Sequence, residues 1–242
     1  MIATLASVTL RGLLNRRRTL LLALFGVLIV IIAALSRLSD PSDADALEFT
    51  GRLLADFGLA VLLPLVAVIV GTAAIGSELE DGTIIYLLAK PIPRATIVAV
   101  KLVVAWLLVA ALVAPAVLLA GLVGTSGQAD LGVANAVAIA VAGLEYTAVF
   151  LALSLLTSRA LVVGLAYVVI WEGVIGGLFE GTRIISIRQH ALAIADALGG
   201  EGAVTAELAA GSALIVGGVI TALALVIAVR RLERVELRGE TG

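Results

Sequence analysis

The sequence contains no cysteine, one histidine and few charged residues. The lack of cysteine excludes disulfides and thiolate metal sites, and a single histidine excludes a histidine-cluster metal site. Charged residues make up 14% of the 242-residue chain, against about 25% in soluble proteins, while hydrophobic residues make up 62%. The net charge is −2 without a compact basic patch, which gives no indication of a nucleic-acid partner. The chain is therefore not a soluble globular domain.

The apolar residues gather in long runs, and each run is long enough to cross a bilayer. A helix of about 20 apolar residues crosses the hydrocarbon layer. Four runs carry no charge, and two more are each interrupted by one carboxylate. The sequence predicts an all-α integral membrane protein in which residues 1–242 form a single transmembrane domain, surrounded by membrane lipid. We expect six spans, at about 19–38, 54–76, 97–124, 132–157, 160–179 and 208–229.

The basic residues are distributed unevenly between the two sides of the membrane. Six spans place both termini on one side, and that side then holds twelve of the sixteen lysines and arginines. Basic loops remain in the cytoplasm. We therefore expect a multi-pass protein of the plasma membrane with both termini in the cytoplasm. Residues 37–52 would then form an outer loop, and residues 179–207 would also lie outside.

The first 18 residues have the pattern of an amphipathic helix. Thr4, Ser7 and Arg11 recur at helical spacing on one face, and apolar residues occupy the other. This pattern fits a helix that lies in the cytoplasmic membrane interface before the first span. The alternative is a short amphipathic segment without a special role. We favour an interfacial helix that is formed by residues 1–18.

The cytoplasmic segment between spans two and three, residues 77–96, is more organised than a plain connection. Acidic residues follow the second span, and Gly82 permits a turn. Asp81 or Thr83 can cap a short helix over residues 84–89, and two prolines then end that helix. The segment is either a solvated turn or a docking element that receives force from a cytoplasmic partner, and its organisation favours the second.

A set of residues in and around this segment has a distinctive spacing. Its members are Ile75, Glu78, Glu80, Gly82, Thr83, Leu87, Leu88, Pro91, Arg94 and Lys101. The pattern resembles the signature of ABC type-2 permeases, the membrane subunits of ATP-driven exporters. The six spans, the cytoplasmic termini and the interfacial helix extend this resemblance over essentially the whole chain.

The resemblance implies an assembly with several subunits. Two identical copies of the permease, a homodimer, would bind two cytoplasmic ABC ATPase subunits that hold ATP and Mg. Residues 157–161 would make a second, smaller contact with the ATPase. The residues implied in coupling to the ATPase are Glu78, Glu80, Asp81, Gly82, Thr83, Leu87, Leu88 and Arg94.

The chain has no nucleotide-binding motif of its own. A P-loop requires Gly-Lys-Ser/Thr, so that backbone amides and the lysine can hold phosphates. The only lysines are Lys90 and Lys101, and they follow alanine and valine. We therefore expect no catalytic residue, metal or cofactor in this chain, and a motor that resides on another polypeptide.

Glu145 and Glu172 lie inside the fourth and fifth predicted spans. A carboxylate at such depth costs roughly 2.5–3.5 kcal/mol on insertion scales, so it should face protein or water rather than lipid. One interpretation is a structural carboxyl that bonds to a neighbour such as Tyr146 or Tyr167. Another is substrate or proton handling.

A third interpretation pairs these carboxylates with Arg183 or Arg188. It requires the segment between spans five and six to fold back into the membrane. The family resemblance implies such a re-entrant segment and therefore favours this pairing. From the residues alone, all three interpretations remain open.

Three glycines recur every four residues in and after the fifth predicted span. Gly173, Gly177 and Gly181 would give one side of this span a smooth strip, which lets helices approach closely. The strip fits a subunit interface and a contact within one subunit equally well.

Two other function classes compete with the permease. An ion- or proton-coupled secondary transporter could use Glu145 and Glu172, but no internal repeat is visible. An intramembrane serine protease could use Ser126 in a Gly-Thr-Ser-Gly string with His190 as its base. Both residues fall in outer segments, whereas that chemistry needs a recessed serine beside its base. The permease accounts for more of the sequence than either alternative.

Overall fold

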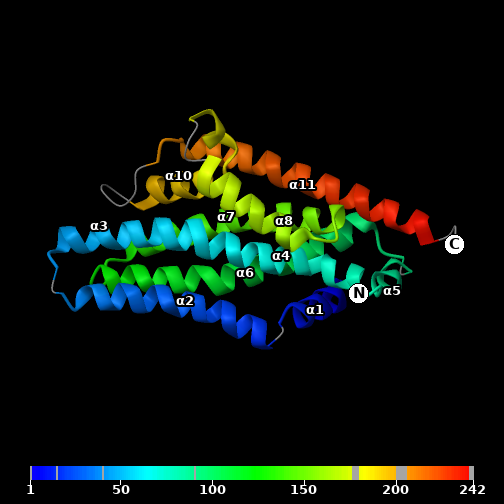
Figure 1. The fold of residues 1–242 in the computed structure, drawn as a ribbon, viewed down its shortest axis with the longest axis horizontal. Coiled ribbons are helices and arrows are strands. Elements are labelled where there is room, and N and C mark those ends of the chain that lie inside the picture. The colour runs from blue at the N-terminus through cyan, green and yellow to red at the C-terminus, as the bar shows by residue number, and fades with distance from the viewer. Residues whose placement is uncertain are drawn as a thin grey trace.

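The structure is a computed structural model that describes residues 2–14, 16–39, 41–89, 91–175, 180–199 and 206–239. Every regular element in these ranges is a helix (Figure 1). Within the described ranges, five helices are long and apolar enough to cross a membrane. These observations confirm the predicted all-α membrane protein.

The helix α7 (Ala129–Leu156) lies at the centre of the bundle. It packs against α4 (Leu63–Glu80), α6 (Arg94–Gly124), α10 (Ile187–Gly199) and α11 (Ala210–Gly239). The apolar window of α7 is 61% buried, whereas those of α2 (Arg16–Arg37) and α11 are only 22% buried. The inner helices therefore pack against protein, and the outer ones leave most of their apolar surface uncovered.

Small residues bring α6 and α7 into backbone contact. A Cβ atom on Gly121 of α6 would lie 2.5 Å from the Cα atom of Gly132 in α7. Helices in a membrane gain little from the hydrophobic effect and associate through close van der Waals packing. Glycine at both positions therefore fixes how closely these two spans approach.

The N-terminal helix is shorter than predicted. The helix α1 covers Ile2–Leu13, and the three arginines expected in it instead begin α2. Thr4, Ser7 and Arg11 are exposed, in agreement with the predicted polar face, and Leu5 is buried where α1 packs on α6 and α4.

The second spanning helix starts earlier than predicted. α3 (Asp43–Leu53), η1 (Leu54–Leu62) and α4 form one continuous helix of 38 residues, so most of the expected outer loop 37–52 is helical. The Ser42 side chain accepts a hydrogen bond from the Asp45 backbone N–H at 3.3 Å and caps the start of α3. The nine residues of η1 adopt a π-helix directly before Pro64, whose missing N–H disturbs regular α-helical bonding.

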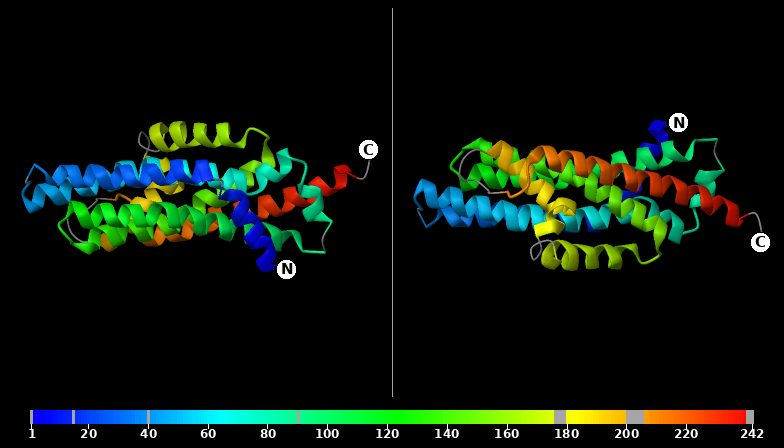
Figure 2. Two further views of the ribbon diagram at one scale, coloured as in Figure 1. Left: turned by 90° about the horizontal axis from the view of Figure 1, so that it is seen from below. Right: turned by 90° about the horizontal axis from the view of Figure 1, so that it is seen from above.

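The fifth predicted span, 160–179, is a short two-part helix in the described residues. Seven α-helical residues form α8 (Ala160–Ala166) and nine π-helical residues form η2 (Tyr167–Ile175). This length falls short of the five spanning helices, and residues 176–179 lie outside the described residues. Both views of Figure 2 show this helix standing off from the rest of the bundle.

After this helix the chain folds back onto the bundle. η3 (Glu180–Ile185) leads into α10, which lies alongside α7 toward the end of the bundle that holds α3 (Figure 1). We call this end the α3 end. The opposite end, which we call the α5 end, holds α5 (Ile84–Leu88), α1 and the last turns of α11 (Figure 1).

Candidate coupling surface and intramembrane polar network

The connection between α4 and α6 contains the short helix that its sequence predicts. α5 covers Ile84–Leu88, close to the expected range 84–89. Gly82 has a φ of +68° in the turn before it, a conformation that favours glycine.

The expected cap of α5 is wrong. Thr83 occupies the N-cap position without a capping bond from its side chain, and Asp81 instead ends α4. The other end of α5 is held by Arg94, whose guanidinium donates a hydrogen bond to the Leu88 carbonyl at 3.0 Å. A basic group at this position satisfies a carbonyl that has no partner within the helix.

The two faces of α5 differ in exposure. Ile84 and Leu88 are buried against the bundle, whereas Ile85 is 67% exposed and Tyr86 is 77% exposed. Beside them, Leu87 lines a groove of about 390 Å³ between α5 and α1. The free surface of α5 is therefore apolar and aromatic.

Glu78 points into the protein, toward Lys101. The Lys101 side chain is fully buried, and its Nζ atom donates hydrogen bonds to Glu78 Oε1 at 2.7 Å and to the Ala74 carbonyl at 2.8 Å. These bonds join the end of α4 to the start of α6 on either side of α5. Glu80 and Asp81, in contrast, are exposed.

The segment expected to make a second contact lies beside this connection. A cavity of about 600 Å³ is lined by Ser77 and Glu80 from α4 and by residues 157–162 after α7. Both predicted contact regions therefore meet at the α5 end of the bundle.

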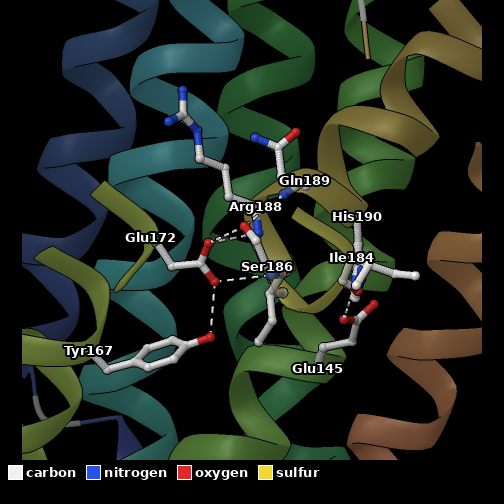
Figure 3. A network of polar contacts seen from close by, with 9 residues as sticks. Glu145, Tyr167, Glu172, Ile184, Ser186, Arg188, Gln189 and His190 are labelled. Atoms are coloured by element: carbon white, nitrogen blue, oxygen red, sulfur yellow. Dashed lines mark hydrogen bonds and ion pairs between the residues drawn. The ribbon is translucent and has the colours of Figure 1, made fainter. Parts of the chain in front are cut away.

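Glu172 accepts hydrogen bonds at the start of α10. Its carboxylate receives the Tyr167 hydroxyl at 3.0 Å, the Ser186 hydroxyl at 2.5 Å and the Ile187 backbone N–H at 3.0 Å (Figure 3). A negative charge beside the first N–H groups of a helix stabilises that helix. Glu172 is thus a structural carboxylate that bonds to Tyr167, as one of the three interpretations of the sequence expected.

Glu145 pairs with His190, the only histidine of the chain. His190 Nδ1 lies 2.7 Å from Glu145 Oε2, and its Nε2 lies 2.9 Å from the Ile184 carbonyl (Figure 3). Because a carbonyl only accepts hydrogen bonds, Nε2 carries a proton. Nδ1 and the carboxylate then share a further proton, and both side chains are buried.

The pairing of His190 with Glu145 was not predicted from the sequence, where the only role considered for His190 was that of a base for Ser126. Ser126 lies in the turn between α6 and α7, and both ring nitrogens of His190 have other partners. The geometry therefore gives the protease hypothesis no support. The sequence offered one signal for this pair: the single histidine lies in the segment that was expected to fold back toward Glu145.

The expected pairing of Arg183 or Arg188 with Glu145 or Glu172 is wrong. The Arg188 guanidinium lies 3.1 Å from Asp56 in η1, and Arg183 forms an ion pair with Glu207. Only the Arg188 backbone N–H approaches Glu172, at 3.4 Å. Both arginine side chains are largely buried, and the carboxylates that they reach are themselves exposed.

The glycine strip has no partner helix within the described part of this chain. A Cβ atom on Gly173 would come near only the Val168 carbonyl of its own helix, and one on Gly181 in η3 would meet nothing within 4 Å. Gly177 lies outside the described residues. The alternative of packing within one subunit thus gains no support, and the subunit interface remains a prediction.

Residues 14–179 match the family described as ABC-2 family transporter protein. This match covers more than half of the chain. The chain belongs to the ABC-2 transporter family. A search among curated proteins finds no significant match.

Membership of the ABC-2 family confirms the resemblance seen in the sequence. The chain is a multi-pass permease component of an ABC transporter, a transmembrane subunit that is not itself catalytic, and the family implies association with an ABC ATPase. The matched residues include α5 and the Lys101–Glu78 pair. They end before α10 and α11, so His190 lies beyond them.

Proposed function

We propose that this chain is the membrane-spanning subunit of an ATP-driven exporter in which two copies form the translocation path. Two separate ATPase subunits, loaded with ATP and Mg²⁺, drive the path from the cytoplasm. The observation that carries this proposal is α5, a short helix that is packed on the bundle through Ile84 and Leu88, held at one end by Arg94, and left uncovered on its apolar face.

The exposed face of α5 is the proposed seat for the ATPase. Ile85 and Tyr86 offer an apolar and an aromatic side chain, a type of residue that dominates the centre of protein interfaces. The exposed acidic residues Glu80 and Asp81 lie beside them and contribute at the rim. Glu78 supports the seat from within, because it holds Lys101.

The anchoring of α5 gives a route for force. Movement of α5 acts on α4 through the Gly82 turn and on α6 through Arg94, and the Lys101–Glu78 pair makes these two spans move together. Residues 157–162, across the cavity from Glu80, are the proposed second contact.

The α5 end is the proposed cytoplasmic side of a plasma-membrane protein. The basic residues of the sequence favour this side for both termini. The positions of α1 and of the last turns of α11 at the same end as α5 support the shared side (Figure 1).

A substitution on the exposed face tests the docking seat. Ile85→Asp should lower co-purification of the ATPase subunit at least about tenfold, because a charge replaces an apolar contact at the centre of the interface. Glu80→Ala should lower it less, since rim charges contribute little to affinity. Leu38→Asp, at an 80% exposed position of the α3 end, is the matched control.

Equal recovery of the ATPase with Ile85→Asp and with Leu38→Asp would overturn the docking role. Equal amounts of both variants in the membrane, measured by immunoblot, exclude a folding defect as the cause of any loss.

The ion- or proton-coupled secondary transporter gains no specific support. Glu145 and Glu172 both form hydrogen bonds within the chain, and Glu172 accepts a bond from the first backbone N–H of α10. Transport that follows a proton gradient without ATP would favour that alternative.

A further inference from the structure

The Glu145 carboxylate lies against the backbone of α11 at Gly217. A Cβ atom at this position would come within 2.7 Å of Glu145 Oε2 and closer still to Oε1. Real Cβ atoms essentially never make such contacts, so an alanine at 217 must displace the carboxylate or the helix. Glycine at this position is thus tied to the presence of Glu145.

The neighbouring glycine shows that this requirement is specific to one position. A Cβ atom on Gly218 would meet nothing within 4 Å. Both glycines belong to the same helix and have the same intrinsic helix propensity. They differ in what faces them, which makes Gly218 a matched control for Gly217.

Three helices therefore meet at one carboxylate. α7 carries Glu145, α10 brings His190 within 2.7 Å of it, and α11 leaves room for it at Gly217. The start of α10 is held in addition by Glu172 from η2 and by the Asp56–Arg188 pair from η1. Both of these carboxylates come from π-helical segments. Such segments are rare in proteins overall, but where they occur they are often found at functional sites.

We infer that Gly217 is a positioning residue, whose lack of a side chain lets Glu145 reach His190, and that this pair is a latch holding α10 against α7. The inference rests on the proposed function and deepens it: in an exporter driven from the α5 end, helix movements during the transport cycle act on this latch. A shift of α11 relative to α7 changes the space at Gly217 and thereby acts on the latch.

The single histidine allows a direct test of the positioning role. In the purified full-length chain, without a histidine tag, all imidazole signals of ¹⁵N-histidine belong to His190. The wild type and Gly218→Ala should show a ring N–H hydrogen-bonded to a carboxylate. Gly217→Ala and Glu145→Ala should both lose this signal, and its persistence in Gly217→Ala overturns the inference.

The lack of cysteine allows a test of the latch. Ala191 is fully buried in α10, next to His190. A single Ala191→Cys should react slowly with a membrane-impermeant maleimide in the wild type and in Gly218→Ala. It should react about tenfold faster or more in Gly217→Ala, since the buried hydrogen bond between His190 and Glu145 no longer opposes opening. An unchanged rate together with the lost imidazole signal overturns the latch.

A double variant separates the carboxylate from other effects of the added methyl group. In a Glu145→Ala background the methyl group of Gly217→Ala has space, so it should change neither expression nor labelling further. The comparison remains informative if Gly217→Ala alone fails to fold. In that case the double variant should recover the expression level of Glu145→Ala. A full additional loss in the double variant overturns the role assigned to Gly217.

These experiments use the chain without its ATPase, so they are independent of the docking proposal. If the imidazole and labelling results hold but addition of the ATPase and ATP never alters Ala191→Cys labelling, the link between the latch and the transport cycle fails. The positioning of Glu145 by Gly217 then stands, and the docking proposal is decided separately by the Ile85→Asp experiment.

Discussion

Two hydrogen-bonded polar pairs hold the helices of this protein in different ways. Lys101 and Glu78 lie 23 positions apart and join the two helices that flank α5. His190 and Glu145 lie 45 positions apart, and their contact depends on a third helix at Gly217. The first pair stiffens a local connection, whereas the second can be released by movement of any of three helices. We therefore expect the first to transmit force and the second to respond to it.

The largest expected effect is a loss of stability on breaking the Lys101–Glu78 pair. Glu78→Ala leaves the fully buried Lys101 without its counter-charge, and removal of one partner from a buried pair destabilises by about 3–5 kcal/mol. Thermal unfolding of the detergent-solubilised protein should show a much lower Tm than the wild type.

The double variant Glu78→Ala/Lys101→Met is the control for this effect. It removes both charges, so it should recover most of the lost stability. A double variant as unstable as Glu78→Ala would mean that the charge pair does not explain the loss.

The next effect concerns the cap of α10. Glu172→Ala removes the acceptor of the Ser186 hydroxyl and the Ile187 N–H, which are buried donors. Leaving a buried donor unsatisfied costs about 1–3 kcal/mol. Unfolding should shift by this amount, and maleimide labelling of Ala191→Cys should become faster. No change in labelling would show that α10 does not depend on this carboxylate.

A smaller loss of stability at α10 is expected from breaking the Asp56–Arg188 pair. Asp56 is 72% exposed where it meets Arg188, and exposed ion pairs contribute about 0.2–1 kcal/mol. Asp56→Asn should therefore lower the free energy of unfolding less than Glu172→Ala does. The reverse order would contradict the assignment of Glu172 as the main anchor.

The smallest effect is expected far from both pairs. Arg52 and Glu48 form an i,i+4 pair on α3 with side chains 75% and 60% exposed. Such pairs contribute about 0.3–0.5 kcal/mol, so Arg52→Ala should be barely distinguishable from the wild type in the same unfolding assay. A larger loss would show that α3 matters more to the bundle than its exposed surface indicates.

Most of the fold was predictable because its signals are local. Apolar runs locate the spanning helices, and the Gly82 turn followed by two prolines locates α5. The early start of the second helix at Asp43 was missed, although Ser42 before two acidic residues is a recognisable cap. The π-helical second half of the fifth predicted span, η2, was not predictable, because hydropathy does not distinguish an α-helix from a π-helix.

The polar network was only partly predictable because its partners are distant in sequence. Burial of Glu145 and Glu172 followed from their depth, but their partners His190 and Ser186 became neighbours only through the fold-back of α10. Glu78 was expected to face a partner protein and instead faces Lys101, a contact that the spacing of the two residues alone does not specify.

Cross-linking from α5 tests the central claim most directly. Because the chain has no cysteine, Tyr86→Cys supplies a single reactive thiol on the exposed face of α5, and Leu38→Cys supplies one at the α3 end. With a thiol-specific bifunctional reagent in native membranes, we expect Tyr86→Cys to cross-link to a nucleotide-hydrolysing subunit and Leu38→Cys to give no such product. A cross-link from Leu38→Cys alone, or none from either position in membranes that contain the ATPase, would contradict the account.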